Sequence, residues 1–161
     1  MADSEFHPAK FSDPDVTAKG ETRASVVWTG LKTLWLNTGT LCNIECVNCY
    51  IESSPRNDRL VYLTRADVRP FLDEIDKPIE IGITGGEPFM CPEILGIMED
   101  VLADGHSLLL LTNAMRPMMR PRIQQGLERL AETYGCRMIL RVSLDSHEAV
   151  VHDEERGSGA F

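Results

Sequence analysis

Three cysteines in one short stretch are the residues of this sequence best suited to chemistry. Cys42, Cys46 and Cys49 stand at C-x3-C-x2-C spacing. Thiolates bind zinc and iron, and three of them on one loop can converge on one inorganic centre. The other cysteines and all four histidines lie well away in the sequence, so no fourth ligand stands close by to complete a tetrahedral zinc site. On an iron–sulfur cluster, three protein ligands would leave one iron open to bind another molecule.

Two other interpretations of the cysteine triplet stay open at this point. The triplet could form a zinc site that takes its fourth ligand from a distant part of the chain. Alternatively, Cys46 and Cys49 could act as a redox-active dithiol. For the remaining cysteines, Cys91 and Cys136, we expect the ordinary role of buried structural thiols.

Two apolar runs and two stretches of alternating apolar residues predict four strands separated by helices. We expect strands at 31–38, 79–84, 108–111 and 138–144, helices at 64–77, 92–105 and 121–134, and a helical turn at 146–151. In the fourth strand, Met138, Leu140, Val142 and Leu144 share the face expected to meet the helices. Strands joined by helices favour parallel pairing with right-handed crossovers. The predicted fold class is therefore α/β with a parallel sheet.

A polar motif follows each predicted strand. The cysteines follow the first, Gly85-Gly86-Glu87-Pro88 the second, Thr112-Asn113 the third and Ser143-Leu144-Asp145 the fourth. Chemistry in βα folds collects at the carboxyl ends of the strands, so we expect these motifs on one rim. Paired glycines allow the backbone to approach a small ligand closely. Asn113 could bind a ligand or cap its turn, and Asp145 could bind a ligand, cap a helix or pair with Arg141.

Taken together, these motifs resemble the radical S-adenosylmethionine superfamily. The cysteine spacing, the GGEP turn, the Thr-Asn strand end, the Ser-Leu-Asp segment and the stretch from His152 to Phe161 all match segments of that family. The resemblance runs from about residue 34 to residue 161. The sequence departs from the family at Asn48, where an aromatic residue is usual, and at Ala114, where glycine often stands.

The resemblance implies a fold, cofactors and an activity. The expected fold is a partial (β/α) barrel, with about four of six βα units in this chain. Cys42, Cys46 and Cys49 would bind a four-iron, four-sulfur (4Fe-4S) cluster. S-adenosylmethionine would be held by a second set of residues: Gly85, Gly86, Glu87, Asn113, Ser143, Asp145 and Arg156. One-electron reduction, with a flavodoxin or ferredoxin as donor, would yield a 5′-deoxyadenosyl radical that abstracts hydrogen from a peptide or small-molecule substrate. The alternative function is a non-catalytic zinc or iron–sulfur module that serves stability or sensing.

Bulk properties set the remaining expectations. A length of 161 residues with 43% hydrophobic and 25% charged residues is typical of one globular domain. We expect an extended or mobile leader over 1–24 and, over 25–161, the N-terminal part of a longer barrel domain. The net charge of −9 argues against a nucleic-acid partner. No apolar run suits a membrane span or a signal peptide, and the clustered cysteines favour a reducing compartment, so we expect the cytoplasm.

Overall fold

The computed structural model describes residues 12–161 and divides into two compact units at Gly30. In the first unit, Val16 and Thr22 form an antiparallel bridge. The Asp13 carboxylate accepts the Val16 N–H at 2.9 Å, which tightens the turn before that bridge. The predicted leader, 1–24, falls partly outside the described residues, and the division of the chain at residue 24 stays a prediction.

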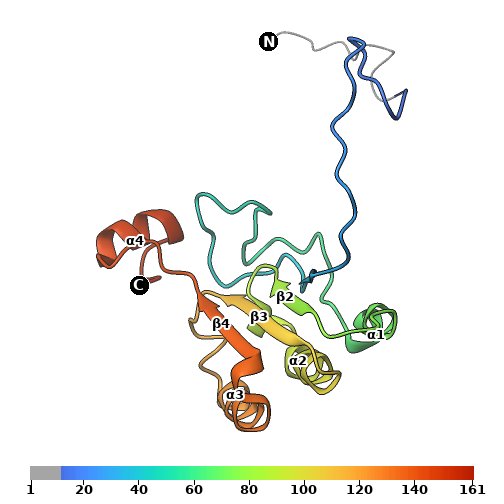
Figure 1. Cartoon of the computed structure of the whole chain (residues 1–161). Coiled ribbons are helices and arrows are strands. Elements are labelled where there is room, and N and C mark those ends of the chain that lie inside the picture. Colours follow the sequence, from blue (N-terminus) through green and yellow to red (C-terminus); the bar gives the residue numbers. More distant parts are fainter. Residues whose placement is uncertain (1–11) are drawn as a thin grey trace. The chain divides into compact units, whose positions relative to one another are not determined.

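The second unit is built on a four-stranded parallel sheet (Figure 1). Its strands lie in chain order: β1 (Thr33–Asn37), β2 (Glu80–Thr84), β3 (Ser107–Thr112) and β4 (Met138–Val142). Its helices are α1 (Arg65–Asp73), α2 (Ile94–Ala103), α3 (Pro121–Tyr134) and α4 (Ala149–Arg156), with single 3-10 turns η1 (Pro88–Met90) and η2 (Gly135–Arg137). The predicted α/β class with parallel strands is confirmed.

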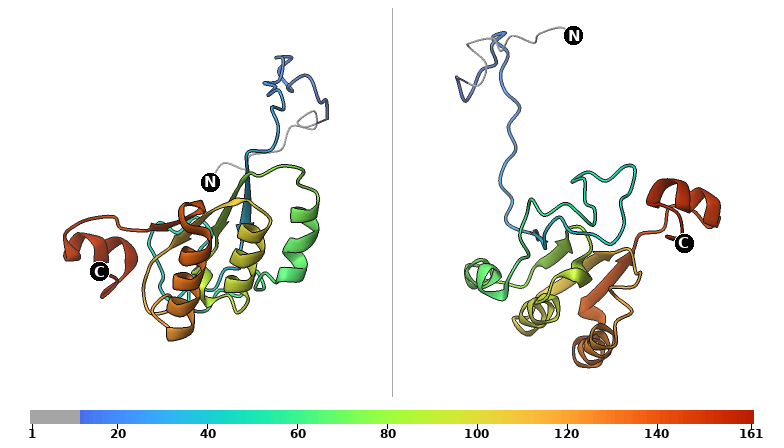
Figure 2. Two further views of the ribbon diagram at one scale, coloured as in Figure 1. Left: turned by 60° about the horizontal axis from the view of Figure 1, so that its bottom comes forward. Right: turned by 180° about the vertical axis from the view of Figure 1, so that it is seen from behind.

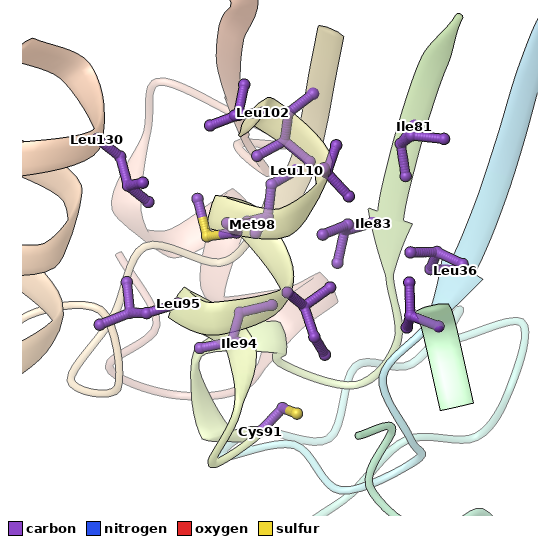
Figure 3. Close-up of a cluster of buried hydrophobic side chains, with 14 of the residues drawn as sticks. Leu36, Ile81, Ile83, Cys91, Ile94, Leu95, Met98, Leu102, Leu110 and Leu130 are labelled. Carbon is purple, nitrogen blue, oxygen red and sulfur yellow. The ribbon is translucent and has the colours of Figure 1, made fainter. Parts of the chain in front are cut away.

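Helices α1, α2 and α3 cover one face of this sheet (Figure 2). The side chains of that face and the inward faces of the helices form the core (Figure 3). Its strand residues include Leu36, Ile81, Ile83, Leu108 and Leu110, and its helical residues include Ile94, Leu95, Met98, Leu102 and Leu130. Cys91 is buried here, as expected, and its thiol donates a hydrogen bond to the Leu63 carbonyl at 3.2 Å.

The opposite face of the sheet carries exposed apolar side chains. Trp35 is 48% exposed and Ile139 is 54% exposed. Trp35 lies across β2 at Gly82, where a Cβ atom would come within 2.4 Å of the indole ring. Glycine at this position therefore allows the indole to lie flat against the sheet. This is the face that a partial barrel turns towards its lumen.

Helix α1 begins as the sequence predicts but ends at Asp73, four residues before the predicted end, and three further details differ. The Thr64 hydroxyl accepts the Asp67 N–H, and the Asp67 carboxylate accepts the Thr64 N–H, which completes the predicted capping box. Strand β4 ends at Val142, so Val142 and Leu144 do not continue the buried face and are 52% and 62% exposed. The helix after β4 starts later than predicted and runs to Arg156. Cys136 is exposed, because it lies in the turn η2 outside the packed strand.

Candidate functional site

A pocket of about 280 Å³ opens at the carboxyl ends of the four strands. Segments following all four strands contribute to its wall, because parallel pairing brings these ends to one edge. Eight of the ten predicted site residues line it: Cys42, Cys46, Cys49, Gly85, Gly86, Asn113, Ser143 and Arg156. Glu87 and Asp145 are not among the lining residues. The structure thus brings the predicted motifs together at one rim.

The cysteine loop folds back on itself and is held by backbone hydrogen bonds. The Cys42 N–H donates to the Ser54 carbonyl at 3.1 Å, beside a parallel bridge between Leu41 and Ser54. The Ser53 N–H donates to the Cys49 sulfur at 3.2 Å. Among residues 12–161, no three Cys, His, Asp or Glu side chains meet closely enough to hold a single metal ion. The three cysteines instead line the wall of the pocket together.

Burial controls the acidity of two of the three thiols. It raises the pKa of Cys42, against the opposing effect of a backbone hydrogen bond from Ile44. It also raises the pKa of Cys46, although the nearby Arg156 guanidinium favours the thiolate. Because metals bind the thiolate, a metal bound by these cysteines would displace their protons.

The Gly-Gly turn packs directly against the cysteine loop. The Gly86 N–H donates to the Gly39 carbonyl at 2.8 Å, and the Glu87 N–H donates to the Leu41 carbonyl at 3.1 Å. A Cβ at Gly86 would come within 2.1 Å of the Leu41 oxygen, and Gly85 has a φ of +144°. We expected these glycines to admit a ligand. The structure adds that they allow the turn after β2 to contact the backbone next to Cys42.

Glu87 joins the ends of β2 and β3 from inside the protein. Its side chain is 1% exposed and accepts three hydrogen bonds: from the Thr112 hydroxyl at 2.9 Å, the Asn113 N–H at 2.9 Å and the Phe89 N–H at 3.1 Å. Burial raises the pKa of this carboxyl, and the hydrogen bonds oppose that effect. The carboxylate therefore fixes the position of Asn113 in the pocket wall.

Asn113 contacts the first cysteine. Its side-chain NH₂ donates to Asn43 Oδ1 at 3.0 Å and approaches the Cys42 sulfur at 3.8 Å, while its Oδ1 accepts the Met115 N–H at 3.0 Å.

Ala114, at the position where the family often has glycine, adopts a φ of +56°. This left-handed conformation is the physical reason for a glycine preference there.

Asp145 pairs with Arg156 rather than with Arg141. The Arg156 guanidinium donates from Nε to the Asp145 carboxylate, and Arg156 also reaches the pocket wall. The Asp145 N–H donates to Nδ1 of the buried His152 at 3.2 Å, so the end of β4 is tied to α4. Asp145 thus lies behind Arg156 and orients it.

Sequence reasoning missed a second connection between α4 and the cysteine loop. Glu155 accepts the Asn48 side-chain N–H at 2.7 Å through its carboxylate, and its carbonyl accepts the Val47 N–H at 2.9 Å. These two loop residues lie between Cys46 and Cys49. The unusual asparagine in the cysteine motif was the one signal that pointed to this contact.

Several known proteins are similar to this chain, although no family model matches it. The subtilosin biosynthesis protein AlbA of Bacillus subtilis is 35% identical over 126 residues, which are 74% of this chain and 26% of AlbA. Mycofactocin maturase MftC of Mycobacterium tuberculosis is 30% identical over 122 residues, 74% of this chain and 29% of MftC. The chain therefore spans about a quarter to a third of these relatives' length.

The fold is also similar to that of SuiB from Streptococcus suis. SuiB bound to S-adenosylmethionine aligns with a TM-score of 0.62 at 20% identity, over 80% of this chain and 28% of SuiB. SuiB bound to its precursor peptide SuiA aligns with a TM-score of 0.64 at 18% identity, over 78% of this chain and 27% of SuiB. The chain belongs to the radical S-adenosylmethionine superfamily. Its four parallel strands form part of the partial barrel that is typical of this superfamily.

Proposed function

We propose that this protein binds a 4Fe-4S cluster and S-adenosylmethionine in the pocket at the strand ends, as part of a radical enzyme. The observation that carries the proposal is the shared pocket. Three cysteines from one loop line it, glycine, amide and hydroxyl groups come from the ends of the other three strands, and the Arg156 guanidinium comes from the end of α4. A set of thiols suited to binding iron and a set of groups suited to a small zwitterion thus line the same pocket.

The residues present fit these two groups. A cluster takes one cysteine on each of three irons, so its ligands surround a pocket instead of meeting at one point. Cys42, Cys46 and Cys49 supply that arrangement. Gly85 and Gly86 present backbone to the pocket, and Arg156 is the cation in its lining, suited to a carboxylate. Asn113 and Ser143 add neutral hydrogen-bonding groups for the amino, carboxylate or ribose groups of the ligand.

In this proposal, residues of the chain hold and orient the bound cluster and S-adenosylmethionine. When bound, the cluster and S-adenosylmethionine supply one-electron chemistry that ends in hydrogen abstraction from the substrate. Asp145 sets the orientation of the Arg156 guanidinium, and Glu87 sets the position of Asn113. Hydrogen bonds from the Gly-Gly turn hold the cysteine loop against the sheet. In this proposal Glu87 and Asp145 act as positioning residues behind the residues that touch the ligand.

For the substrate we propose a peptide. AlbA is named for the biosynthesis of a bacteriocin, and SuiB has been crystallised with a precursor peptide. The exposed Trp35 of the lumen face offers apolar contact close to the pocket, because the hollow that it lines shares Thr84 and Leu111 with the pocket. A flavodoxin or ferredoxin would supply the electron. The cytoplasm stays our proposed location; no helix within residues 12–161 has the length and apolar character of a membrane span.

The alternative is a non-catalytic module that holds zinc or an iron–sulfur cluster. Anaerobic reconstitution, followed by metal analysis and incubation with S-adenosylmethionine and dithionite, separates the two. Our proposal predicts close to four irons per chain and formation of 5′-deoxyadenosine that depends on dithionite. A chain that takes up one zinc per molecule and forms no 5′-deoxyadenosine would favour the alternative.

A further inference from the structure

A buried hydroxyl in the pocket wall lacks a partner. Within residues 12–161, Ser53 Oγ is the one buried side-chain polar atom without a hydrogen bond. Ser53 is 3% exposed and lines the same pocket as the three cysteines. Leaving a buried hydroxyl unpaired costs about 1–3 kcal/mol, so such an atom in a native protein calls for an explanation.

Other buried hydroxyls of the same region are satisfied by the protein. Thr38 Oγ1 donates to the Thr84 carbonyl at 3.0 Å. Thr40 Oγ1 donates to the Asn57 carbonyl at 3.0 Å and accepts the Leu60 N–H at 3.1 Å. These two threonine hydroxyls thus have protein acceptors, whereas Ser53, in the wall of the pocket, has none.

The backbone of Ser53 lies next to the third cysteine of the triplet. The Ser53 N–H already donates to the Cys49 sulfur at 3.2 Å, and the hydroxyl of the same residue lies beside that amide. We propose that the Ser53 hydroxyl donates a hydrogen bond to a sulfur of the bound cluster, either the Cys49 thiolate or the adjacent sulfide. This inference rests on the proposed function, because it needs a cluster on Cys49.

Such a hydrogen bond would tune the redox behaviour of the cluster. Hydrogen bonds to cluster sulfurs are one of the factors that set reduction potentials. A donor stabilises the more negative, reduced cluster more than the oxidised one, and so it raises the midpoint potential. Ser53 is then a positioning and tuning residue beside the cluster, and its hydroxyl eases reduction.

The test compares Ser53→Ala with Ser54→Ala in the anaerobically reconstituted full chain. Ser54 is the matched control, because its hydroxyl accepts the Arg56 and Asn57 N–H groups at 3.3 and 3.1 Å within the loop. We expect all three proteins to bind iron. Potentiometric titration without S-adenosylmethionine should show a more negative midpoint for Ser53→Ala than for the wild type, and no shift for Ser54→Ala.

A second readout uses the protein before iron loading. Ser53→Ala removes a hydroxyl without a protein partner, so its melting temperature should equal or exceed that of the wild type, whereas Ser54→Ala should melt lower. An unchanged midpoint in Ser53→Ala overturns the proposal. If its affinity for S-adenosylmethionine falls instead, the hydroxyl faces that ligand and the proposal is equally overturned. A wild-type chain that binds no iron–sulfur cluster would contradict the proposed function itself.

Discussion

The five free cysteines differ in where they lie, and only three of them are candidate cluster ligands. Cys42, Cys46 and Cys49 line the pocket, Cys91 is enclosed in the core, and Cys136 is exposed in a turn. Replacing any one of the triplet by Ala should abolish the cluster or reduce its iron content severely. Cys136→Ala and Cys91→Ala should keep it. Iron analysis and visible absorbance after reconstitution measure the effect, and a complete cluster in Cys46→Ala would contradict the assignment.

His106 gives the stability of the fold a pH dependence of predictable sign. Its buried Nδ1 accepts the Ile79 N–H at 3.2 Å, and burial lowers the pKa of this imidazole below 6.5. The stabilisation by neutral His106 is therefore fully present above about pH 6.5 and is lost as the pH falls through the lower, folded-state value.

The corresponding variant is His106→Leu. It leaves the Ile79 N–H unpaired and should lower the free energy of unfolding by about 1–3 kcal/mol at pH 8. The deficit relative to the wild type should shrink at pH 5, where the wild type has itself lost stability. Urea denaturation at both pH values measures this. The control is His147→Leu, since the His147 side chain is 91% exposed; equal deficits for His106→Leu at pH 5 and pH 8 would refute the assigned sign.

Among the structural elements, the Gly-Gly turn that follows β2 and the cysteine loop are packed together through their backbones. A side chain at Gly86 would collide with the backbone of Leu41 and Cys42. We therefore expect Gly86→Val to lose cluster and S-adenosylmethionine binding together, at least tenfold in each. Gly20→Val is the control for a strained glycine replacement outside the site, because an added Cβ there meets nothing within 4 Å while the φ of +80° disfavours any side chain. Retention of a full cluster with loss of S-adenosylmethionine binding alone would show that the turn contacts only the ligand.

Helix α4 forms a second support of the cysteine loop through Glu155. Glu155→Ala removes the acceptor of the Asn48 side chain and should loosen the loop between Cys46 and Cys49. The expected result is release of iron to a chelator several times faster than in the wild type. The control is Glu154→Ala at the neighbouring, exposed position, which should release iron at the wild-type rate. Equal release rates in the two variants would mean that the contact between Glu155 and Asn48 does not stabilise the loop.

The sequence predicted those elements that are determined by residues close together in the chain. Apolar runs and alternation predicted the strands β1 to β4, and parallel pairing then predicted that Cys42, Asn113 and Ser143 share one rim, as they do in the pocket. The role of Glu87 was not accessible, since its partners Thr112 and Asn113 come from another strand. Contacts between residues far apart in sequence, such as Asn48 with Glu155, leave no periodic signal.

In the whole molecule, one pocket would have to hold two different groups. The cysteines would have to leave one iron of the cluster accessible, and the glycine, amide and guanidinium groups of the same pocket would have to hold S-adenosylmethionine next to it. Each group can be present without the other in a protein of different function. Their interaction is therefore more informative than the binding of either alone.

The most direct test is the electron paramagnetic resonance spectrum of the reduced, reconstituted chain, recorded with and without S-adenosylmethionine. We expect the signal of a reduced 4Fe-4S cluster that changes when S-adenosylmethionine is added, because the ligand would bind the iron that no cysteine holds. Arg156→Ala should need a higher S-adenosylmethionine concentration for the same change. A signal that is identical with and without S-adenosylmethionine, or a chain that takes up zinc and shows no cluster signal, would contradict the proposed function.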